Sequence, residues 1–289
     1  MAVKAPPCSP VSTIRSDLGI GNDGLRAFIE CHSRLCVLTG AGCSTDSGIP
    51  DYRDAMGEWK RARPVTLQDF MGNEVTRRRY WARSLIGWPR IDRARPNGAH
   101  HALTQLQRLG RIEVLITQNV DGLHQAAGTR GVIDLHGRLD QVRCMDCEHR
   151  SARTRLHERL LSSNPSWAHL DAQSAPDGDA DLEVWDFSGF EVPACEQCGG
   201  VLKPDVVFFG ESVPRERVAA AMRGLREADA LLVVGSSLMV YSGYRFARVA
   251  AAAGQPIAAV NLGKNRADAL LALKVDRPCA AALAFLLEL

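Results

Sequence analysis

The residues with the clearest capacity for chemistry are four cysteines in two C-x-x-C pairs, Cys144 with Cys147 and Cys195 with Cys198. Two intervening residues let both sulfurs of a pair reach one Zn²⁺ ion in tetrahedral geometry, and a second pair completes its coordination shell. Four thiolates leave no open position for a substrate, so we expect one structural zinc rather than a catalytic one. Four reduced cysteines without a metal are the alternative, which the paired spacing disfavours.

A second candidate is the loop at residues 40–53, GAGCSTDSGIPDYR, which follows an apolar run at residues 35–39. Gly40 and Gly42 allow a tight turn and a close approach of a ligand to the backbone, as the phosphates of a dinucleotide require. Thr45 stands where a dehydrogenase fingerprint has its third glycine, and no acidic residue follows at the expected distance. Hydride transfer is therefore disfavoured, and a plain strand-to-helix turn is the alternative for this loop taken alone.

Short apolar runs recur along the chain, and helical segments separate most of them. The runs lie at residues 35–39, 113–116, 132–135, 206–209, 231–234 and 257–260. This alternation predicts an α/β fold with a Rossmann-like parallel sheet covered on both faces. Nearly every run ends in Gly, Ser, Asn, Asp or His, and these ends share the edge where such sheets bind ligands. Turn propensity explains Gly235 and Gly263, but not Gln118, Asn119 and Asp121.

His136 is the candidate base, because a neutral imidazole can accept a proton near pH 7. The nearby strand end with Asn119 and Asp121 favours catalysis over the structural role that a lone histidine more often has. We expect Cys43, which has no histidine beside it in sequence, to have a packing role. We assign no role to the histidines with weaker context, His100, His101 and His124.

The chain of 289 residues can hold one large domain and a smaller one. The expected division is a tail at residues 1–20, a Rossmann-like domain at residues 21–137 and 205–289, and a zinc-binding module with a long inserted loop at residues 138–204. A helical insertion is expected at about residues 55–96. Further helices are predicted at residues 23–31, 97–110, 215–228 and 244–253. On the second of these the apolar face consists of Ala102, Leu103, Leu106 and Leu109.

Charge and hydropathy exclude some classes of function. A formal net charge of +2 argues against the concentrated basic face that nucleic-acid binding needs. No apolar run is long enough to span a bilayer, and the N-terminus does not resemble a secretory signal. Together with metal-type cysteine spacing, this predicts a reducing, cytoplasmic location. The mitochondrial matrix is the alternative, because the N-terminus is weakly similar to a transit peptide.

The motifs, taken in order, resemble those of the sirtuin family. The matching segments are residues 40–53, TQNVDGLH at 117–124, LHG at 135–137, the two cysteine pairs, KPDVVFFGE at 203–211, GSS at 235–237 and NLG at 261–263. The resemblance extends over residues 34–279. Within the family, the chain is most similar to the class II, mitochondrial sirtuin-4 type. The segments that carry this narrower match are RYWAR at 79–83, GWP at 87–89, APDGD at 175–179 and VYSGYRF at 240–246.

The resemblance implies NAD-dependent removal of acyl groups from protein lysines, with transfer to ADP-ribose and release of nicotinamide. His136 would be the base that activates the ribose hydroxyls, with Asn119 and Asp121 at the ribose and nicotinamide positions. Residues 207–210 would pair with the substrate peptide as an added strand, which makes Val207, Phe208, Phe209 and Gly210 substrate-binding residues. Tyr52 stands where the family usually has Phe. The expected NAD-binding residues are Gly40, Ala41, Gly42, Ser44, Asp51, Tyr52, Arg53, Gln118, Asn119, Val120, Asp121, Gly235, Ser236, Ser237, Asn261, Leu262, Gly263 and Cys279.

Tyr80 and Arg83 are three residues apart, which places them on one face of a helix. In some sirtuins a Tyr-x-x-Arg pair in this region binds acidic acyl groups such as succinyl. The guanidinium fork suits a carboxylate, so we expect both residues to bind substrate. A solvated basic helix is the alternative, because residues 77–79 are all arginine.

Two rival functions use the same motifs. Mono-ADP-ribosyl transfer to a protein would use the same activation of NAD with a different acceptor. A non-catalytic NAD- or ADP-ribose-sensing module would keep the glycine loop but would not need His136. Release of nicotinamide from NAD plus an acyl peptide would exclude the second rival.

Overall fold

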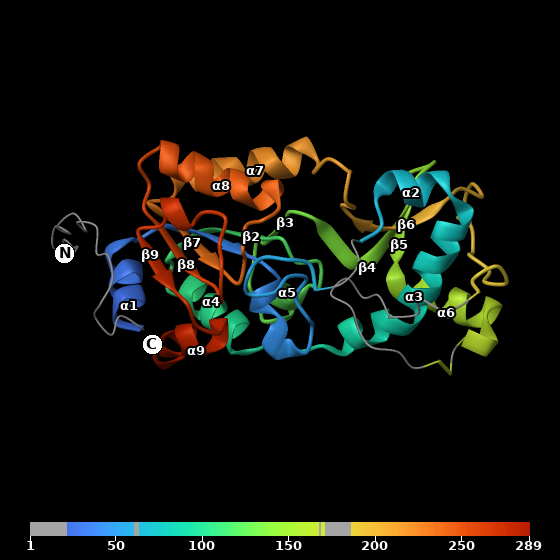
Figure 1. Cartoon of the computed structure of the whole chain (residues 1–289), viewed down its shortest axis with the longest axis horizontal. Coiled ribbons are helices and arrows are strands. Elements are labelled where there is room, and N and C mark those ends of the chain that lie inside the picture. The colour runs from blue at the N-terminus through green and yellow to red at the C-terminus, as the bar shows by residue number, and fades with distance from the viewer. Residues whose placement is uncertain (1–21, 61–63, 168, 171–185) are drawn as a thin grey trace.

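The structure, a computed structural model, describes residues 22–60, 64–167, 169–170 and 186–289 (Figure 1). The expected tail at residues 1–20 and the motif at residues 175–179 lie outside the described residues. The described chain forms a six-stranded parallel sheet with helices on both faces and a separate three-stranded antiparallel sheet. The predicted Rossmann-like α/β fold is therefore confirmed. None of the described helices is long and apolar enough to cross a membrane.

The six strands of the large sheet have the order β3-β2-β1-β7-β8-β9, and every neighbouring pair is parallel. Their bounds are β1 (Leu35–Thr39), β2 (Ile112–Thr117), β3 (Ile133–Asp134), β7 (Ala230–Val234), β8 (Ile257–Val260) and β9 (Leu273–Val275). All residues of β1, β7 and β8 are buried, as expected for strands covered on both faces. The strand order reverses at β1, so the loop after β1 lies where open sheets of this kind bind ligands.

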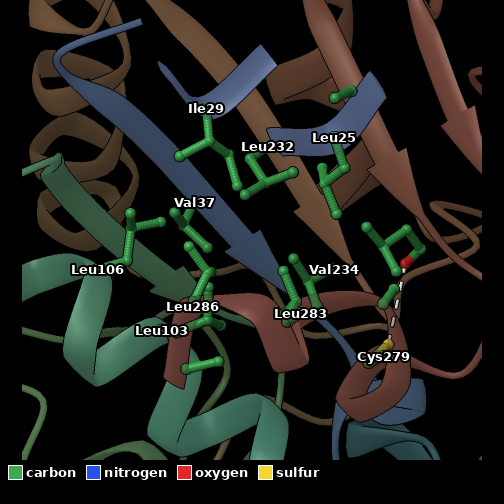
Figure 2. Close-up of a cluster of buried hydrophobic side chains, with 14 of the residues drawn as sticks. Leu25, Ile29, Val37, Leu103, Leu106, Leu232, Val234, Cys279, Leu283 and Leu286 are labelled. Carbon is green, nitrogen blue, oxygen red and sulfur yellow. Dashed lines mark hydrogen bonds between the residues drawn. The ribbon is translucent and has the colours of Figure 1, made fainter. Parts of the chain in front are cut away.

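Alternate residues of the central strands point into two apolar clusters. On one face, Val37 and Leu232 pack in a cluster with α1 (Asn22–Cys31), α4 (Gly98–Arg108) and α9 (Cys279–Leu283) (Figure 2). On the opposite face, Leu38 and Leu231 pack with α7 (Arg215–Glu227) and α8 (Tyr241–Ala252). The prediction for Leu109 is wrong, because α4 ends at Arg108 and the Leu109 side chain is 45% exposed.

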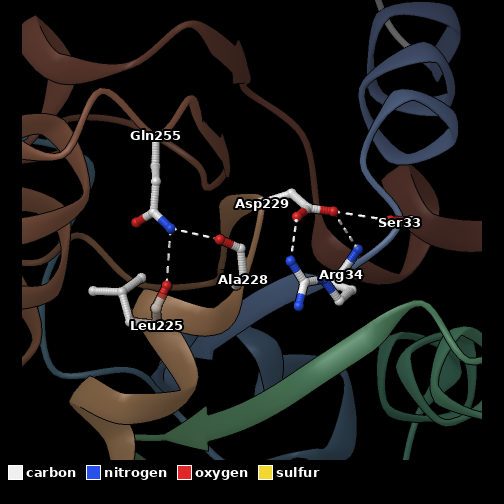
Figure 3. Close-up of polar contacts among 6 residues, drawn as sticks. All are labelled: Ser33, Arg34, Leu225, Ala228, Asp229 and Gln255. Carbon is white, nitrogen blue, oxygen red and sulfur yellow. Dashed lines mark hydrogen bonds and ion pairs between the residues drawn. The ribbon is translucent and has the colours of Figure 1, made fainter.

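A polar contact fixes the amino ends of β1 and β7 at the edge of the sheet away from the glycine loop (Figure 3). Asp229, just before β7, accepts hydrogen bonds from Ser33 Oγ at 2.9 Å and from Arg34 N at 3.0 Å, just before β1. Gln255 Nε2 donates to Leu225 O at 2.9 Å and to Ala228 O at 2.6 Å. The second contact gives a side-chain donor to two carbonyl groups at the C-terminal end of α7, where Leu225 O also accepts from Ala228 N at 3.3 Å.

The smaller sheet has the order β5-β4-β6, with both pairs antiparallel. Its strands are β4 (Gly137–Cys144), β5 (Arg150–Ala152) and β6 (Leu202–Val206). The helices α2 (Leu67–Gly72), α3 (Glu74–Arg93) and α6 (Arg153–Ser163) share its apolar cluster. Trp81 Nε1 of α3 donates to Leu202 O at 3.2 Å. The helical insertion therefore packs against the cysteine-bearing sheet.

The remaining short elements are α5 (Leu123–Ala126), η1 (Ala41–Cys43), η2 (Thr45–Ser47), η3 (Pro165–Trp167), η4 (Asp268–Leu270) and η5 (Ala284–Glu288).

The prediction that residues 206–209 form a strand of the large sheet is wrong. The strand is β6, which ends at Val206 and pairs with β4 in the smaller sheet. Beyond it, Val207 N donates to His136 O at 2.7 Å, and Phe209 O accepts from Leu67 N at 2.9 Å. The apolar pattern misses β6 because the strand contains Lys203, whose charge is buried.

Candidate active site

The loop after β1 packs directly onto the end of β7. Gly40 N donates to Val234 O at 3.0 Å. A Cβ atom at Gly40 would lie 2.7 Å from Ser236 Cβ, and one at Gly235 would lie 2.1 Å from Cys43 N. Gly235 also has a φ of +64°, which L side chains rarely adopt. The glycines are thus required for the contact between these two loops, before any ligand is considered.

A hydrogen-bond chain links this loop to the end of β2. Asn119 Nδ2 donates to Gly40 O and to Ser44 Oγ, both at 3.0 Å. Ser44 Oγ in turn donates to Asp121 Oδ2 at 2.7 Å, and Asp121 Oδ1 accepts from Leu123 N at 2.9 Å. Burial raises the pKa of Asp121, although these donors oppose the shift. The chain holds an amide, a hydroxyl and a carboxyl group in fixed orientation at the sheet edge.

The end of β7 is joined to the end of β2 in the same way. Ser236 Oγ donates to Gln118 Oε1 at 2.6 Å, and Asn265 Nδ2 donates to Ser236 O at 2.7 Å. The predicted strand ends therefore meet along one edge, as the parallel topology requires.

His136 lies between β3 and β4, with both ring nitrogens engaged. Nδ1 lies 2.9 Å from Gln118 O, and Nε2 lies 2.8 Å from Ser242 Oγ on α8. A carbonyl oxygen can only accept, so Nδ1 carries the proton and Nε2 carries the lone pair. Burial lowers the pKa of His136, and Arg245 and Arg217 act in the same direction, against the Gln118 bond. The imidazole is therefore neutral near pH 7, with Nε2 as its basic atom.

Most of the predicted site residues line one cavity of about 1150 Å³ between the two sheets. On the large-sheet side it is lined by Gly40, Ala41, Gly42, Ser44, Gln118, Asn119, Val120, Asp121, Gly235, Ser236, Ser237, Asn261 and Leu262. The remaining predicted lining residues are Asp51, Tyr52, Arg53, Tyr80, His136, Val207, Phe208, Phe209 and Gly210. Residues more than two hundred positions apart in sequence thus share one concave surface.

Three of the residues predicted to bind NAD or substrate do not line this cavity. Cys279 is buried in the apolar cluster of α9, with its Sγ 3.9 Å from Val260 O (Figure 2). Gly263, with a φ of +74°, packs so closely that a Cβ atom would lie 2.3 Å from Ala55 O. Arg83 is half-buried on α3.

Aromatic rings form the wall opposite the large sheet. The Trp59 ring lies edge-on to Tyr52 and Phe209, with centroid distances of 6.2 and 5.6 Å. Deeper in, Tyr80 packs 5.3 Å from the Phe208 ring. The rings make this wall apolar, whereas the large-sheet wall is polar.

A buried ion pair holds the segment at residues 207–210. Lys203 Nζ lies 3.1 Å from Glu211 Oε2, and the two side chains are only 3% and 20% exposed. Phe208 N donates to the same carboxylate oxygen at 2.9 Å. Burial lowers the pKa of Lys203, and Glu211 opposes that shift. The segment is thus fixed by this charge pair to Lys203 of β6, in addition to its backbone hydrogen bonds to His136 and Leu67.

The four paired cysteines converge as predicted. Cys144 Sγ lies 3.5 Å from Cys198 Sγ, Cys147 Sγ lies 3.8 Å from Cys195 Sγ, and all four sulfurs lie within 4.8 Å of one another. A tetrahedral zinc with Zn–S bonds of about 2.3 Å separates its sulfurs by about 3.8 Å. Asp146 Oδ2 accepts from Val201 N at 2.9 Å, which ties the two knuckles together. The group therefore fits one structural zinc.

A second group, Cys43 with His100 and His124, also has its ligand atoms within 4.8 Å of one another. It is completely buried beneath the glycine loop. However, His100 Nδ1 accepts from Asn97 N at 3.3 Å, so the proton of this ring is on Nε2. His100 would have to break this cap of α4 to bind a metal through Nε2. The group is consistent with the packing role expected for Cys43.

Several residues that line the cavity were not predicted, among them Trp59, Ser242 and Arg245. Ser242 and Arg245 line it from the first turns of α8. Arg245 Nε is buried and lacks a hydrogen-bond partner among the described residues. Both lie in the segment at residues 240–246 that carried the narrower resemblance, but nothing in its pattern indicated that it faces His136.

Comparison with known proteins places these observations in a family. The model of the Sir2 family matches residues 40–242, more than half of the chain. An "NAD-dependent protein deacetylase" of Xanthomonas campestris pv. campestris (strain 8004) is 66% identical over 262 residues, which cover 91% of this chain and 89% of that protein. An "NAD-dependent protein deacetylase 2" of Bradyrhizobium diazoefficiens is 64% identical over 272 residues, covering 94% and 100%.

A solved structure described as "Sir2-p53 peptide-NAD+" superposes with a TM-score of 0.76 at 29% identity, covering 92% of this chain and 97% of that one. Another, described as "Sir2 bound to acetylated peptide", gives a TM-score of 0.75 at 28% identity, covering 92% and 96%. The fold, the cysteine group and the sheet-edge motifs thus agree with the sequence relationships, and the chain belongs to the Sir2 family.

Proposed function

We propose that the chain is an NAD-dependent protein-lysine deacylase that transfers the acyl group to ADP-ribose. The observation that carries this proposal is His136, a neutral imidazole whose basic Nε2 is at the wall of the large cavity. Relatives over almost the whole chain are named deacetylases, and related structures contain NAD and acetylated peptides.

The residues of the large-sheet wall suit NAD. The strand ends present the glycine loop, Ser236 and Asn261 to the cavity. Arg245 offers an N–H without a partner in the described part of the chain, which suits an anionic group. Bound NAD would supply an electrophilic ribose carbon with nicotinamide as its leaving group. His136 would accept a proton from a ribose hydroxyl at Nε2. Asn119 and Asp121 would orient the ribose and nicotinamide, since their hydrogen bonds already fix their side chains.

The peptide would bind at residues 207–210, on the opposite wall. This segment lies along the cavity and is anchored at both ends, by Val207 N to His136 O and by Phe209 O to Leu67 N. An extended peptide could pair with it as an added strand and place its acyl-lysine in the cavity. The apolar rings of Tyr80 and Phe208 would contact the acyl chain.

The narrower assignment to the class II, sirtuin-4 type is supported by the sequence segments at residues 79–83, 87–89 and 240–246. With this assignment we propose that Tyr80 and Arg83 form a binding site, here called the Tyr80–Arg83 receptor, for acidic acyl groups. Tyr80 lines the cavity, so this receptor requires the Arg83 side chain to turn toward it. Arg83→Ala should then reduce desuccinylation at least tenfold and leave deacetylation within about twofold, because only the succinyl carboxylate needs the guanidinium. Arg79→Ala is the matched control, and equal loss on both acyl groups would contradict the receptor.

We also infer a structural zinc at the four cysteines, a cytoplasmic location and a two-domain division with one boundary at residues 137–138. The sulfur geometry and the thiolate chemistry of such a site support the first two inferences. The separate apolar clusters of the two sheets support the division, but the second boundary, expected at residues 204–205, would cut β6 and is moved to the end of that strand at Val206.

The decisive test is nicotinamide release from NAD in the presence of a panel of acyl-lysine peptides. His136→Ala should reduce turnover by at least a hundredfold while NAD still binds, because only proton transfer is removed. Exposed His101 provides the control variant. Mass spectrometry should detect O-acyl-ADP-ribose; a stable ADP-ribose adduct on a protein would instead support ADP-ribosyl transfer. Full turnover by His136→Ala would refute the assignment.

A further inference from the structure

Ser242 is the side chain that contacts the basic atom of His136. It is the second residue of α8, it lines the same cavity, and its Oγ lies 2.8 Å from His136 Nε2. The two residues are 106 positions apart in sequence: His136 lies between β3 and β4, and Ser242 lies on a helix that covers the large sheet.

The direction of this hydrogen bond follows from the other ring nitrogen. Nδ1 must donate to Gln118 O, so neutral Nε2 has a lone pair and no proton. Ser242 Oγ–H is therefore the donor, and it points at the atom that would accept the proton in catalysis. A serine hydroxyl has one proton and two lone pairs, so it can also accept from Nε2–H after the base is protonated.

We propose that Ser242 is a positioning residue that holds the His136 ring in one orientation in both of its protonation states. This inference rests on the proposed role of His136 as the base. While the ring is neutral, Ser242 donates to Nε2 and Gln118 O accepts from Nδ1. Because Nε2 has a single lone pair, the Ser242 hydroxyl first turns its proton away from Nε2, and a substrate hydroxyl then gives its proton to that lone pair. The Ser242 oxygen, still within reach, becomes an acceptor for Nε2–H. The ring is thereby fixed at both nitrogens, as efficient proton transfer requires.

The test compares Ser242→Thr with Ser242→Val, two variants of equal shape that differ only in the hydroxyl group. Thr should keep kcat within about threefold of wild type, whereas Val should lower kcat about tenfold or more, because a hydrogen bond to a group that becomes charged is lost. The KM for NAD should change by less than kcat in both variants, because the hydroxyl acts on the base rather than on binding. Equal kcat in the two variants would overturn the proposal.

A spectroscopic measurement separates this proposal from the proposed function. In ¹⁵N-histidine-labelled protein without substrate, the Nε2 resonance of His136 should be the same in wild type and Ser242→Thr, and shifted in Ser242→Val. This result does not depend on activity, so it supports the contact even if wild type fails to release nicotinamide. An unshifted Nε2 resonance in Ser242→Val would overturn it. If wild type is inactive on every acyl peptide, the proposed function fails and the Ser242 contact is judged by the resonance.

Discussion

Acidification should destabilise this protein through two histidines buried beneath the glycine loop. His100 and His124 face each other with ring centroids 4.8 Å apart, and both are completely enclosed. Burial lowers the pKa of His100 to about 4 and that of His124 to about 3, and the nearby imidazoles add to each shift. His124 Nε2 is hydrogen-bonded to Thr39 Oγ1 at 2.9 Å, and its Nδ1 has no partner among the described residues.

The sign follows from the two pKa values of each ring. The unfolded chain binds a proton on each histidine below about pH 6.5, whereas the folded protein stays neutral until about pH 4 or 3. The contribution of each neutral histidine to the free energy of unfolding is therefore complete above the unfolded pKa. It is lost as the pH falls from about 6.5 to the folded pKa of about 4 or 3. At pH 5 the pKa of a histidine in the unfolded chain lies about 1.5 units above the pH. Protonation of the unfolded chain therefore lowers the free energy of unfolding by about 2 kcal/mol for each histidine. Both rings are still neutral in the folded state at pH 5, so the two costs should add to about 4 kcal/mol.

The assay is equilibrium urea unfolding at pH 7 and pH 5, with wild type, His100→Gln, His124→Gln and the double variant. The quantity compared is the loss of unfolding free energy between the two pH values, which is independent of each variant's absolute stability. Each substitution should reduce this loss by about 2 kcal/mol. His101→Gln, at an exposed site, should leave it unchanged.

Other groups do not disturb this comparison, because they are present in every variant. Burial raises the pKa values of Asp121 and Asp134, so protonation of these two groups favours the folded state as the pH falls. The pKa of His136 is lowered, so this residue destabilises the folded state on acidification, as His100 and His124 do. An undiminished loss in the double variant would refute the reasoning. If the double variant does not fold, ring C–H resonances of wild type decide the question: titration of both histidines above pH 5 would be the contrary result.

Two further predictions concern the smaller sheet. Purified protein should contain one zinc per chain by elemental analysis; Cys198→Ala should lose it and should be less stable, whereas Cys43→Ala should retain it. A Cys198→Ala variant with full zinc content would contradict the site. Glu211→Gln should destabilise the protein by about 3 kcal/mol in urea unfolding, because it leaves the Lys203 charge buried without its partner, and it should raise the KM for acyl peptide. Glu74→Gln, which breaks the exposed Arg78–Glu74 pair, should cost less than about 0.5 kcal/mol; equal costs for the two variants would contradict the argument.

Much of the large sheet could be predicted from sequence because its strands are covered on both faces. The runs at residues 35–39, 231–234 and 257–260 are continuous apolar segments, which is the pattern that such burial imposes. The short strand β9 and helix α9 were missed because three to five residues are too few to show a period. β6 was placed wrongly because its buried Lys203 depends on Glu211, which only the folded chain brings near.

In the candidate site, too, some features could be predicted from the sequence and others could not. The convergence of Gln118, Asn119 and Asp121 could be predicted, because parallel strands bring their carboxyl ends to one edge. The cysteine geometry was predictable from spacing alone. The contact between His136 and Ser242 was not, because the two residues are 106 positions apart and only the packing of α8 brings Ser242 to the ring.

The contact between the glycine loop and the end of β7 has a consequence for how this protein can change. At Gly40 and Gly235 the two loops meet backbone to backbone, with less than 3 Å available for a Cβ atom. That wall of the cavity cannot be reshaped by substitution at these positions without separating the loops. The aromatic wall is built from side chains such as Tyr80 and Phe208, which can be exchanged singly. New acyl preferences should therefore arise by substitution on the aromatic wall, while the shape of the opposite wall, formed by the glycine loop and the end of β7, stays constant.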